Sequence, residues 1–323
     1  MPTQMNAAVC ARYGPPEVVT VSPVPIPEPT EGQILVRVRA TTVGPADCAF
    51  RSGTPAFARL YSGLRKPKLS ILGDAVAGDV VAIGAGVHRF RVGDRVLGLN
   101  PKTLGGHADH VCLNANGLVE PLPDTLDYQA AVSILEAATA LTFLRDVARI
   151  QPGETVLING ASGSVGGYAV QLASNLGAHV TGVCSTRNLV HVTSLGAHAV
   201  IDYTTDDFTS NGRRYDVIFD AVGTSSFRRC RAALASGGRY LTTVPSLHAV
   251  GWMLATAITG GRKAKFAATG LMQTNDNITH LTKLADSAVI NPIIDRAYPL
   301  SEIADAYRYV ETGRKTGTVV ITL

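Results

Sequence analysis

The sequence is poor in the residues that build metal clusters and disulfide frameworks. Its five cysteines, Cys10, Cys48, Cys112, Cys184 and Cys230, are dispersed and show no Cys-x-x-Cys spacing. An odd and scattered set is typical of reduced thiols and argues against a disulfide or zinc framework. We therefore expect a reducing compartment and predict a cytoplasmic location.

Long apolar runs and clustered charge are also missing. The best apolar candidate, residues 249–258, is too short to cross a bilayer, and the N-terminus lacks the charged-then-apolar order of a signal peptide. Lys and Arg are scattered, and the formal net charge is only +4. A protein that binds nucleic acid would present a clustered basic face. We predict neither a membrane nor a nucleic acid as a partner.

The chain does contain an alternation of short strands and helices over a length that suits two domains. It has 323 residues, of which 46% are hydrophobic and 17% charged, as in a well-buried globular protein. Short strands separated by glycine turns fill residues 1–121, which is typical of a closed or partly closed β-barrel. Strands and helices alternate over 122–287, which predicts a doubly wound parallel sheet. Residues 288–323 return to barrel-like strands and are expected to complete the first domain.

Some local predictions can be compared directly with a structure. A proline-rich loop is expected at 23–29, before a strand at 33–42. A helix is expected at 225–234, ended by Gly237 and Gly238, with strands at 239–244 and 265–269.

A glycine-rich turn between a strand and a helix is the most informative feature. Val156 to Ile158 form an apolar run typical of a buried parallel strand, and helical spacing begins at Val165. The turn indicates a site for a dinucleotide pyrophosphate, because a helix N-terminus offers free N–H groups and a positive dipole end. Gly163 allows close backbone approach, Gly166 allows the helix to pack against the sheet, and an alanine replaces the usual first glycine. The predicted contacts are Gly160, Ala161, Ser162, Gly163, Ser164, Val165 and Gly166.

The end of the second strand of this unit, at Cys184, predicts the choice of cofactor. An acid there would bind the ribose hydroxyls of NAD and repel a 2′-phosphate. The chain continues Ser-Thr-Arg-Asn, with no acid. Arg187 can pair with a 2′-phosphate and Ser185 can donate to it. We therefore predict NADPH rather than NADH; the alternative is that Arg187 is an ordinary solvated residue.

Longer strings carry a resemblance to a known family. They include GGHADHV, GASGSVGGYAVQLA, YDVIFDAVG and GRKTGTVVI. With them the chain resembles the medium-chain dehydrogenase/reductase family over nearly its whole length, in particular its zinc-free, zeta-crystallin-like quinone oxidoreductase branch. The resemblance implies an α/β protein with a GroES-like barrel domain (1–121 and 288–323), a Rossmann domain (122–287) and a cleft between them.

The positions that match zinc ligands in the family's alcohol dehydrogenases carry other residues. Gly44 stands at the cysteine position, and Asp74 and Ala75 stand where a His and a Glu would be. A catalytic zinc needs about three protein ligands. We predict no metal, and we interpret His107 and His110 as structural or cleft residues.

Two polar residues of the first domain are the predicted catalytic residues. Asp47 and Arg51 keep the family pattern, and the alternative is that they simply pair with each other. The family's quinone reductases often carry Asn at the position of Gly44 and Tyr at that of Ala49, so the substrate class stays open here. Tyr61 is a substitute hydroxyl or, as we prefer, a lid residue.

The resemblance implies five more cofactor contacts outside the turn. Tyr203 matches a tyrosine near the 2′-phosphate, and Val222 and Val244 follow strand ends where a doubly wound sheet binds its ligand. Leu271 resembles a contact on the nicotinamide side, and Lys315 is expected to reach the phosphate. Core packing is the alternative for each of them.

These features predict an enzyme that transfers hydride from NADPH to a quinone or an α,β-unsaturated carbonyl without zinc. The acceptor's charge delocalises to the distant carbonyl oxygen, and solvent supplies the proton. One alternative is a zinc-independent alcohol dehydrogenase or tailoring reductase. Another is a protein that binds NADPH without turnover.

Assembly is predicted from one strand and one helix. The expected strand at 265–269 lies at an edge and has no protecting proline, and 251–258 contains large apolar residues with few core partners. Pairing across a two-fold axis would cover both. We predict a homodimer through the Rossmann domains; the alternative is that Trp252 covers the substrate cleft of a monomer.

Overall fold

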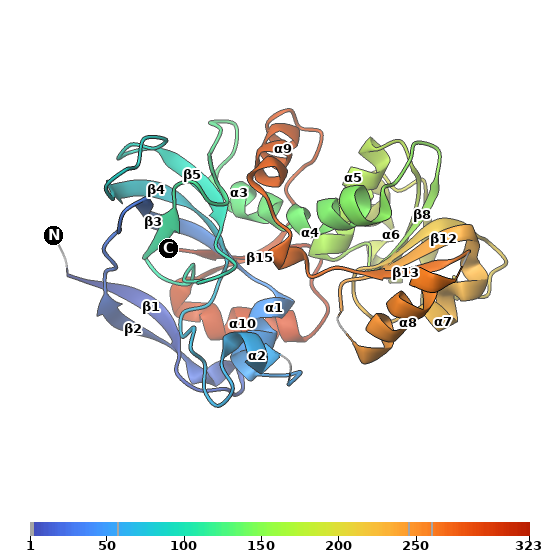
Figure 1. Ribbon diagram of the computed structural model, residues 1–323, viewed down its shortest axis with the longest axis horizontal. Helices are drawn as coiled ribbons and strands as arrows, with labels where there is room; N and C mark the ends of the chain where they lie inside the picture. The colour runs from blue at the N-terminus through green and yellow to red at the C-terminus, as the bar shows by residue number, and fades with distance from the viewer. Residues whose placement is uncertain (1–2, 57, 245, 260) are drawn as a thin grey trace. The chain divides into compact units, whose positions relative to one another are not determined.

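The computed structural model describes residues 3–56, 58–244, 246–259 and 261–323, and only the backbone of Leu271. The chain divides into two compact units, shown in Figure 1: Met1–Leu135 with Gln273–Leu323, and Glu136–Met272. Sequence analysis placed 122–135 and 273–287 in the second domain. In the structure, the helices of these segments, α3 (Tyr128–Leu135) and α9 (Asn275–Asp286), pack on strands of the first unit.

The first unit is built on a seven-stranded sheet and a separate antiparallel pair. The path β14-β15-β3-β4-β5-β7 is antiparallel except between β14 and β15, and β6 also pairs with β3. The strand predicted at 33–42 is confirmed, and its residues Ile34, Val36 and Val38 all lie in one buried core cluster. The strands are β1 (Gln4–Cys10), β2 (Val19–Pro25), β3 (Gln33–Val43), β4 (Ala75–Ile83), β5 (Arg95–Leu99), β6 (His110–Asn114), β7 (Val119–Pro121), β14 (Ile294–Pro299) and β15 (Thr318–Thr322).

Helices cover a second core of the first unit. α1 (Pro45–Ser52) starts with a proline, which suits the first turn of a helix, and ends at Gly53, whose φ of 66° is left-handed. α2 (Ala58–Ser62) and α10 (Ile303–Glu311) both contact α1 or its neighbours. The fully buried Tyr307 of α10 packs with Val319 and Ile321 of β15.

The second unit contains a six-stranded sheet in which all pairings are parallel. Its order, β10-β9-β8-β11-β12-β13, confirms the predicted doubly wound topology. The chain proceeds outward from β8 in one direction and then from β11 in the other, so the order reverses between these two strands. The strands are β8 (Thr155–Asn159), β9 (His179–Cys184), β10 (Ala199–Asp202), β11 (Tyr215–Asp220), β12 (Leu234–Thr242) and β13 (Lys263–Phe266).

Helices of the second unit pack against this sheet, with α5 on one side and α8 on the other (Figure 1). Both are twelve residues long. The helical segments are α4 (Ala137–Leu141), a π-helical turn (Thr142–Ala148), α5 (Ser164–Asn175), α6 (Leu189–Ser194), α7 (Phe227–Cys230) and α8 (Leu247–Ile258), with short 3-10 turns at Thr186–Asn188, Arg231–Ala233 and Thr269–Leu271.

Two local predictions were wrong. The proline-rich segment is not all loop, because β2 runs to Pro25; a strand with a single partner tolerates proline, which has no N–H to donate. Gly237 and Gly238 do not end a helix. They lie inside β12, in a bulge between the pairs Tyr215–Leu234 and Val217–Arg239, and a positive φ of 74° explains the glycine at 237.

Candidate dinucleotide-binding site

The predicted turn connects β8 to α5 at the carboxyl edge of the parallel sheet. The backbone N–H groups of Gly160 and Ala161 both donate to the carbonyl of Val183, at 3.1 and 3.0 Å, which fixes the turn against β9. The N–H of Gly163 donates to the carbonyl of Gly160 at 3.0 Å. Gly163 is the N-cap residue of α5, so the first free N–H groups of the helix follow it directly.

The three glycines of the turn differ in what surrounds them. A Cβ on Gly166 would lie 2.1 Å from the carbonyl oxygen of Gly160, so only glycine lets the helix approach the strand end. Gly160 has a φ of 81°, and its Cβ would meet Val222 at 2.5 Å. A Cβ on Gly163 would meet nothing closer than 3.5 Å. Among the described residues, the space beside the Gly163 backbone is therefore not filled by protein atoms, and a ligand can approach the backbone there.

Ser164 behaves differently from the rest of the turn. Its side chain is buried, and its hydroxyl donates to Glu136 Oε2 at 3.3 Å. Glu136 precedes α4, which packs on α5. The hydroxyl of Ser164 therefore links α5 to the start of α4. The contact with the cofactor that the sequence predicts for Ser164 would be made by its backbone N–H.

The segment after β9 presents polar groups beside the turn. Asn188 is buried, and its amide donates to the hydroxyls of Ser162 and Ser185, at 3.0 and 3.3 Å. This residue, which sequence analysis did not single out, ties the turn to the segment that follows β9. Arg187 is exposed next to it. Tyr203 is also exposed, and its N–H donates to the carbonyl of Cys184 at 3.1 Å, which places it at the same sheet edge.

An acid lies at this edge on the neighbouring strand, and sequence analysis missed it. Asp202 ends β10 and is the register partner of Cys184, the last residue of β9. Its carboxylate accepts from the hydroxyls of Thr186 and Thr204 and from the N–H of Thr204. Hydrogen bonds from Thr186 and Thr204 lower the pKa of Asp202, so its charge persists at neutral pH. Only the strand pairing brings this charge beside the segment that contains Arg187.

The loops after β11 and β12 complete the carboxyl edge. A Cβ on Gly223 would meet Val244 at 2.3 Å, and Gly160 likewise lies under Val222. Val222 and Val244 are 47% and 43% exposed, so neither is a core residue. The structure thus brings these predicted residues to the turn that follows β8, where a doubly wound sheet binds its ligand.

A buried carboxylate holds the loop after β11 in place. Asp220 is fully buried and accepts from the backbone N–H groups of Gly223 and Ser225, at 2.9 and 2.8 Å. It also accepts from the side chains of Asn159 and Tyr240, both at 3.0 Å. Burial, followed by the charge of Asp220, raises the pKa of the Tyr240 phenol and keeps it a donor. These bonds join the ends of β8, β11 and β12.

The predicted catalytic residues have structural partners in the first unit. Asp47 is buried, and its carboxylate accepts from the N–H groups of Gly44 and Gly73, at 2.9 and 3.1 Å. Arg51 is 1% exposed, forms its ion pair with Glu311 of α10, and lies over the Tyr307 ring at 5.2 Å. These contacts anchor α1, and a catalytic part for either residue stays a prediction.

The remaining candidate residues of the first unit, His107, Tyr61 and Lys315, form hydrogen bonds with backbone carbonyls of the same unit. His107 is buried, and its Nε2–H donates to the carbonyl of Thr42 at 2.8 Å, which agrees with a structural histidine. The Tyr61 hydroxyl donates to the carbonyl of Pro101. Lys315 Nζ donates to the carbonyl of Gly317 at 2.8 Å.

Leu271 ends a 3-10 turn, and its side chain lies outside the described part of the chain. Within 3–56, 58–244, 246–259 and 261–323, no group of three or more His, Cys, Asp and Glu side chains is arranged to hold a metal ion. In the same ranges, no helix combines the length and the apolar character that a membrane span requires.

The fold and the turn define a two-unit α/β protein with a candidate dinucleotide-binding site at the carboxyl edge of a parallel sheet. Comparison with known proteins specifies the class further. Residues 30–124 match an alcohol dehydrogenase GroES-like domain, and residues 195–321 match a zinc-binding dehydrogenase. The chain belongs to the medium-chain dehydrogenase/reductase family. It is an oxidoreductase that uses a nicotinamide cofactor.

Individual relatives agree with this assignment. A quinone-oxidoreductase homolog from the chloroplast of Spinacia oleracea is 30% identical over 92% of this chain and 92% of its own length. An NADPH-dependent alkenal/one oxidoreductase from the chloroplast of Arabidopsis thaliana is 28% identical over 99% of this chain and 80% of its own length. The solved structure of the quinone oxidoreductase from Coxiella burnetii has a TM-score of 0.89 at 27% identity, over 99% of each chain.

Proposed function

We propose that this protein reduces a quinone or an α,β-unsaturated carbonyl with NADPH and without zinc. The choice of reaction rests on the residues that stand at the positions of the family's zinc ligands. Gly44 has no side chain, and Ala75 is a buried apolar residue of β4. His107 is committed to the carbonyl of Thr42. A site without a Lewis acid is poorly suited to alcohol oxidation, which needs an alkoxide to be stabilised.

The turn supplies the groups that would hold the cofactor. The N–H groups at the start of α5 would bind the pyrophosphate, with Gly163 leaving room for it. Val222 and Val244 would line the nicotinamide side of the edge. When bound, the reduced nicotinamide supplies the hydride, while the protein orients the reactants and excludes water. Relatives named as a quinone-oxidoreductase homolog and an alkenal/one oxidoreductase support acceptors of this kind.

The preference for NADPH is supported by Arg187. It is exposed directly after β9, and Asn188 fixes the segment that carries it against the turn. A guanidinium pairs with a phosphate through two parallel hydrogen bonds, which the ribose hydroxyl of NADH cannot match.

The test is a screen that follows NADPH absorbance with quinones, enones, aldehydes and, with NADP⁺, alcohols. We expect turnover with quinones or enones and little with simple alcohols. Metal analysis should find no stoichiometric zinc, and chelation should leave the activity intact. Alcohol oxidation that requires zinc would overturn the proposed reaction. NADPH binding without turnover on any acceptor would favour a non-catalytic protein.

A further inference from the structure

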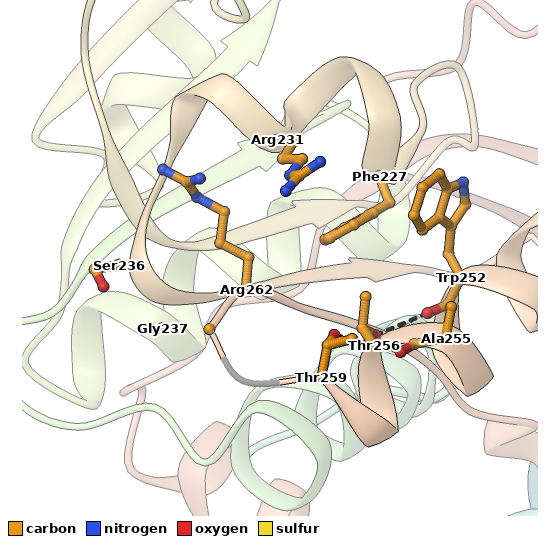
Figure 2. A pocket seen from close by; sticks show the side chains of 10 residues that line it. Phe227, Arg231, Ser236, Gly237, Trp252, Ala255, Thr256, Thr259 and Arg262 are labelled. Carbon is orange, nitrogen blue, oxygen red and sulfur yellow. Dashed lines mark hydrogen bonds between the residues drawn. The ribbon is translucent and has the colours of Figure 1, made fainter.

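A second cavity lies in the same unit, away from the glycine turn. It has a volume of about 400 Å³, within the range of small-molecule sites. Figure 2 shows side chains from α7, the following 3-10 turn, β12, α8 and the start of β13 around it. The lining residues used below are Phe227, Arg231, Ser236, Trp252, Thr256 and Arg262.

The position of this cavity separates it from the dinucleotide site. Ser236 lies in the bulge near the start of β12, and Arg262 directly precedes β13. The dinucleotide turn follows the other end of a parallel strand, and Thr242 of β12 pairs with Asp220 at that edge. At about 3.3 Å per residue, the six residues from Ser236 to Thr242 span roughly 20 Å. The cavity therefore lies near the amino ends of the parallel strands, whereas the dinucleotide site lies at their carboxyl ends.

Two arginines, Arg231 and Arg262, line this cavity. The Nε of Arg262 donates to the carbonyl of Leu234 at 2.9 Å, which orients the rest of the fork. Arg231 is exposed at the end of α7, and both it and Arg262 line the cavity shown in Figure 2. Within the described residues, neither arginine lies within ion-pair distance of a carboxylate. Two cations that line one cavity favour an anion as its ligand.

An aromatic wall adjoins the two arginines. The rings of Phe227 and Trp252 lie 5.2 Å apart between centroids. Phe227 is buried in the core of the unit, so it fixes the position of the partly exposed Trp252. Thr256 anchors this part of α8, because its hydroxyl donates to the carbonyl of Trp252 at 2.7 Å and accepts from the N–H of Ala264 at 3.0 Å. A planar ring can pack on such a wall.

We propose that this cavity binds a small aromatic carboxylate as a second ligand, independent of the dinucleotide site. The carboxylate would pair with Arg231 and Arg262, and the ring would pack against Trp252, with the Ser236 hydroxyl near the rim. The combination of a rigid Arg fork and an aromatic face selects a planar anion over a simple inorganic ion.

The chain offers a direct readout, because Trp252 is its only tryptophan. The full chain is titrated with 3-nitrobenzoate, and with uncharged 3-nitrobenzamide as control, while Trp252 fluorescence is followed and corrected for absorbance. Calorimetry on the same samples gives a second measurement. We expect saturable quenching by the carboxylate and about tenfold weaker binding of the amide. Saturating NADPH should not displace the carboxylate.

Matched variants test the two arginines. Arg231→Gln should weaken binding of 3-nitrobenzoate about tenfold, and R231Q/R262Q should abolish saturation. Arg228→Gln changes an exposed arginine of α7, three positions before Arg231, that does not line the cavity, and it should bind like the unchanged chain. Because Arg231 is exposed, the single variant should fold even if the double variant does not. Equal affinity for the carboxylate and the amide, unchanged binding in R231Q, or displacement by NADPH would each overturn the proposal.

Discussion

At the scale of single residues, the cofactor edge combines a cation and an anion that the sequence separates. Arg187 follows β9 directly, whereas Asp202 ends β10 and reaches the same segment through Thr186. A 2′-phosphate would be attracted by Arg187 and repelled by the carboxylate. The proposed preference for NADPH therefore depends on the balance of these two charges.

Replacing Arg187 should reduce affinity for the phosphorylated cofactor selectively. Arg187→Ala should weaken NADPH binding by about 1.5–3 kcal/mol, because a charge-assisted hydrogen bond is lost. NADH lacks the 2′-phosphate and should be nearly unaffected. Calorimetric dissociation constants for both cofactors check this, and equal losses would show that Arg187 does not contact the phosphate.

Neutralising Asp202 should act in the opposite direction. Asp202→Asn keeps an oxygen that can accept from Thr204, places an amide NH2 beside the Thr186 hydroxyl and removes the charge, so the dissociation constant for NADPH should fall relative to that for NADH. The ratio of the two constants, measured at low and high salt, is the readout, since screening should reduce the effect. A lower NADPH affinity in the variant would contradict a repulsive role.

A buried histidine should make stability depend on pH. Burial lowers the pKa of His107 to about 4, against an ordinary value of 6.5. Between these values the unfolded chain binds a proton that the folded chain does not. The free energy of unfolding should therefore fall as the pH drops from 6.5 to 4, by about 3 kcal/mol from this group.

The variant His107→Gln provides the comparison. Its amide can still donate to the carbonyl of Thr42, but it does not titrate. Urea unfolding between pH 4.5 and 7.5 should show a weaker pH dependence in the variant than in the unchanged chain. Identical slopes would mean that His107 does not set this dependence.

At the scale of elements, the glycine turn contains one glycine that folding requires and another that cofactor binding is expected to require. Gly166 is needed by the protein, because its Cβ would lie 2.1 Å from the backbone oxygen of Gly160. Gly163 has no such neighbour. Sequence analysis expected Gly166 to let the helix pack against the sheet, and this distance agrees; the approach of a ligand to Gly163 stays a prediction.

The pair Gly163→Ala and Gly166→Ala tests this distinction. Gly166→Ala should destabilise the protein by about 1–3 kcal/mol, because overpacking against a backbone atom forces the helix away. Gly163→Ala should keep the melting temperature but lose cofactor affinity, because its methyl group would occupy the position of the pyrophosphate. Thermal unfolding and cofactor titration of both variants are the measurements. Normal NADPH binding by Gly163→Ala would exclude the proposed approach of the phosphates.

At the scale of the whole molecule, an edge strand and an exposed helix face favour self-association. β13 is the last strand of its sheet, as predicted, although it begins two residues before the predicted strand. On α8, Leu247, Leu254 and Ile258 are 91%, 60% and 90% exposed. The prediction also included Trp252, which packs on Phe227 within its own unit. A monomer rarely leaves such a contiguous apolar patch in water.

We expect a homodimer in sedimentation at micromolar concentration. The double variant Leu254→Asp/Ile258→Asp should shift it toward monomer, because two buried charges would oppose association. Val190→Asp is the matched control, since Val190 is an 84% exposed apolar residue on another helix, α6. A monomeric unchanged chain, or equal effects of both variants, would contradict an interface through α8.

The sequence by itself determined the alternation of strands and helices in the second unit, the parallel sheet and the position of the glycine turn. These features follow from local rules: β-branched apolar runs form strands, helical spacing forms helices, and a helix start near glycines binds phosphate. The roles expected of Gly163, Gly166 and Arg187 could be predicted because these residues lie within one strand–turn–helix–strand segment.

Only the tertiary structure decided which distant residues share a site. Asp202 lies beside Arg187 through strand pairing, Asp220 joins three strand ends, and Arg51 pairs with Glu311, 260 positions away. The cavity with Arg231 and Arg262 likewise arises from a bulge and a helix that meet only after folding. Charge and hydrogen-bond partners act over a few ångströms in space, and separation along the chain does not predict that distance.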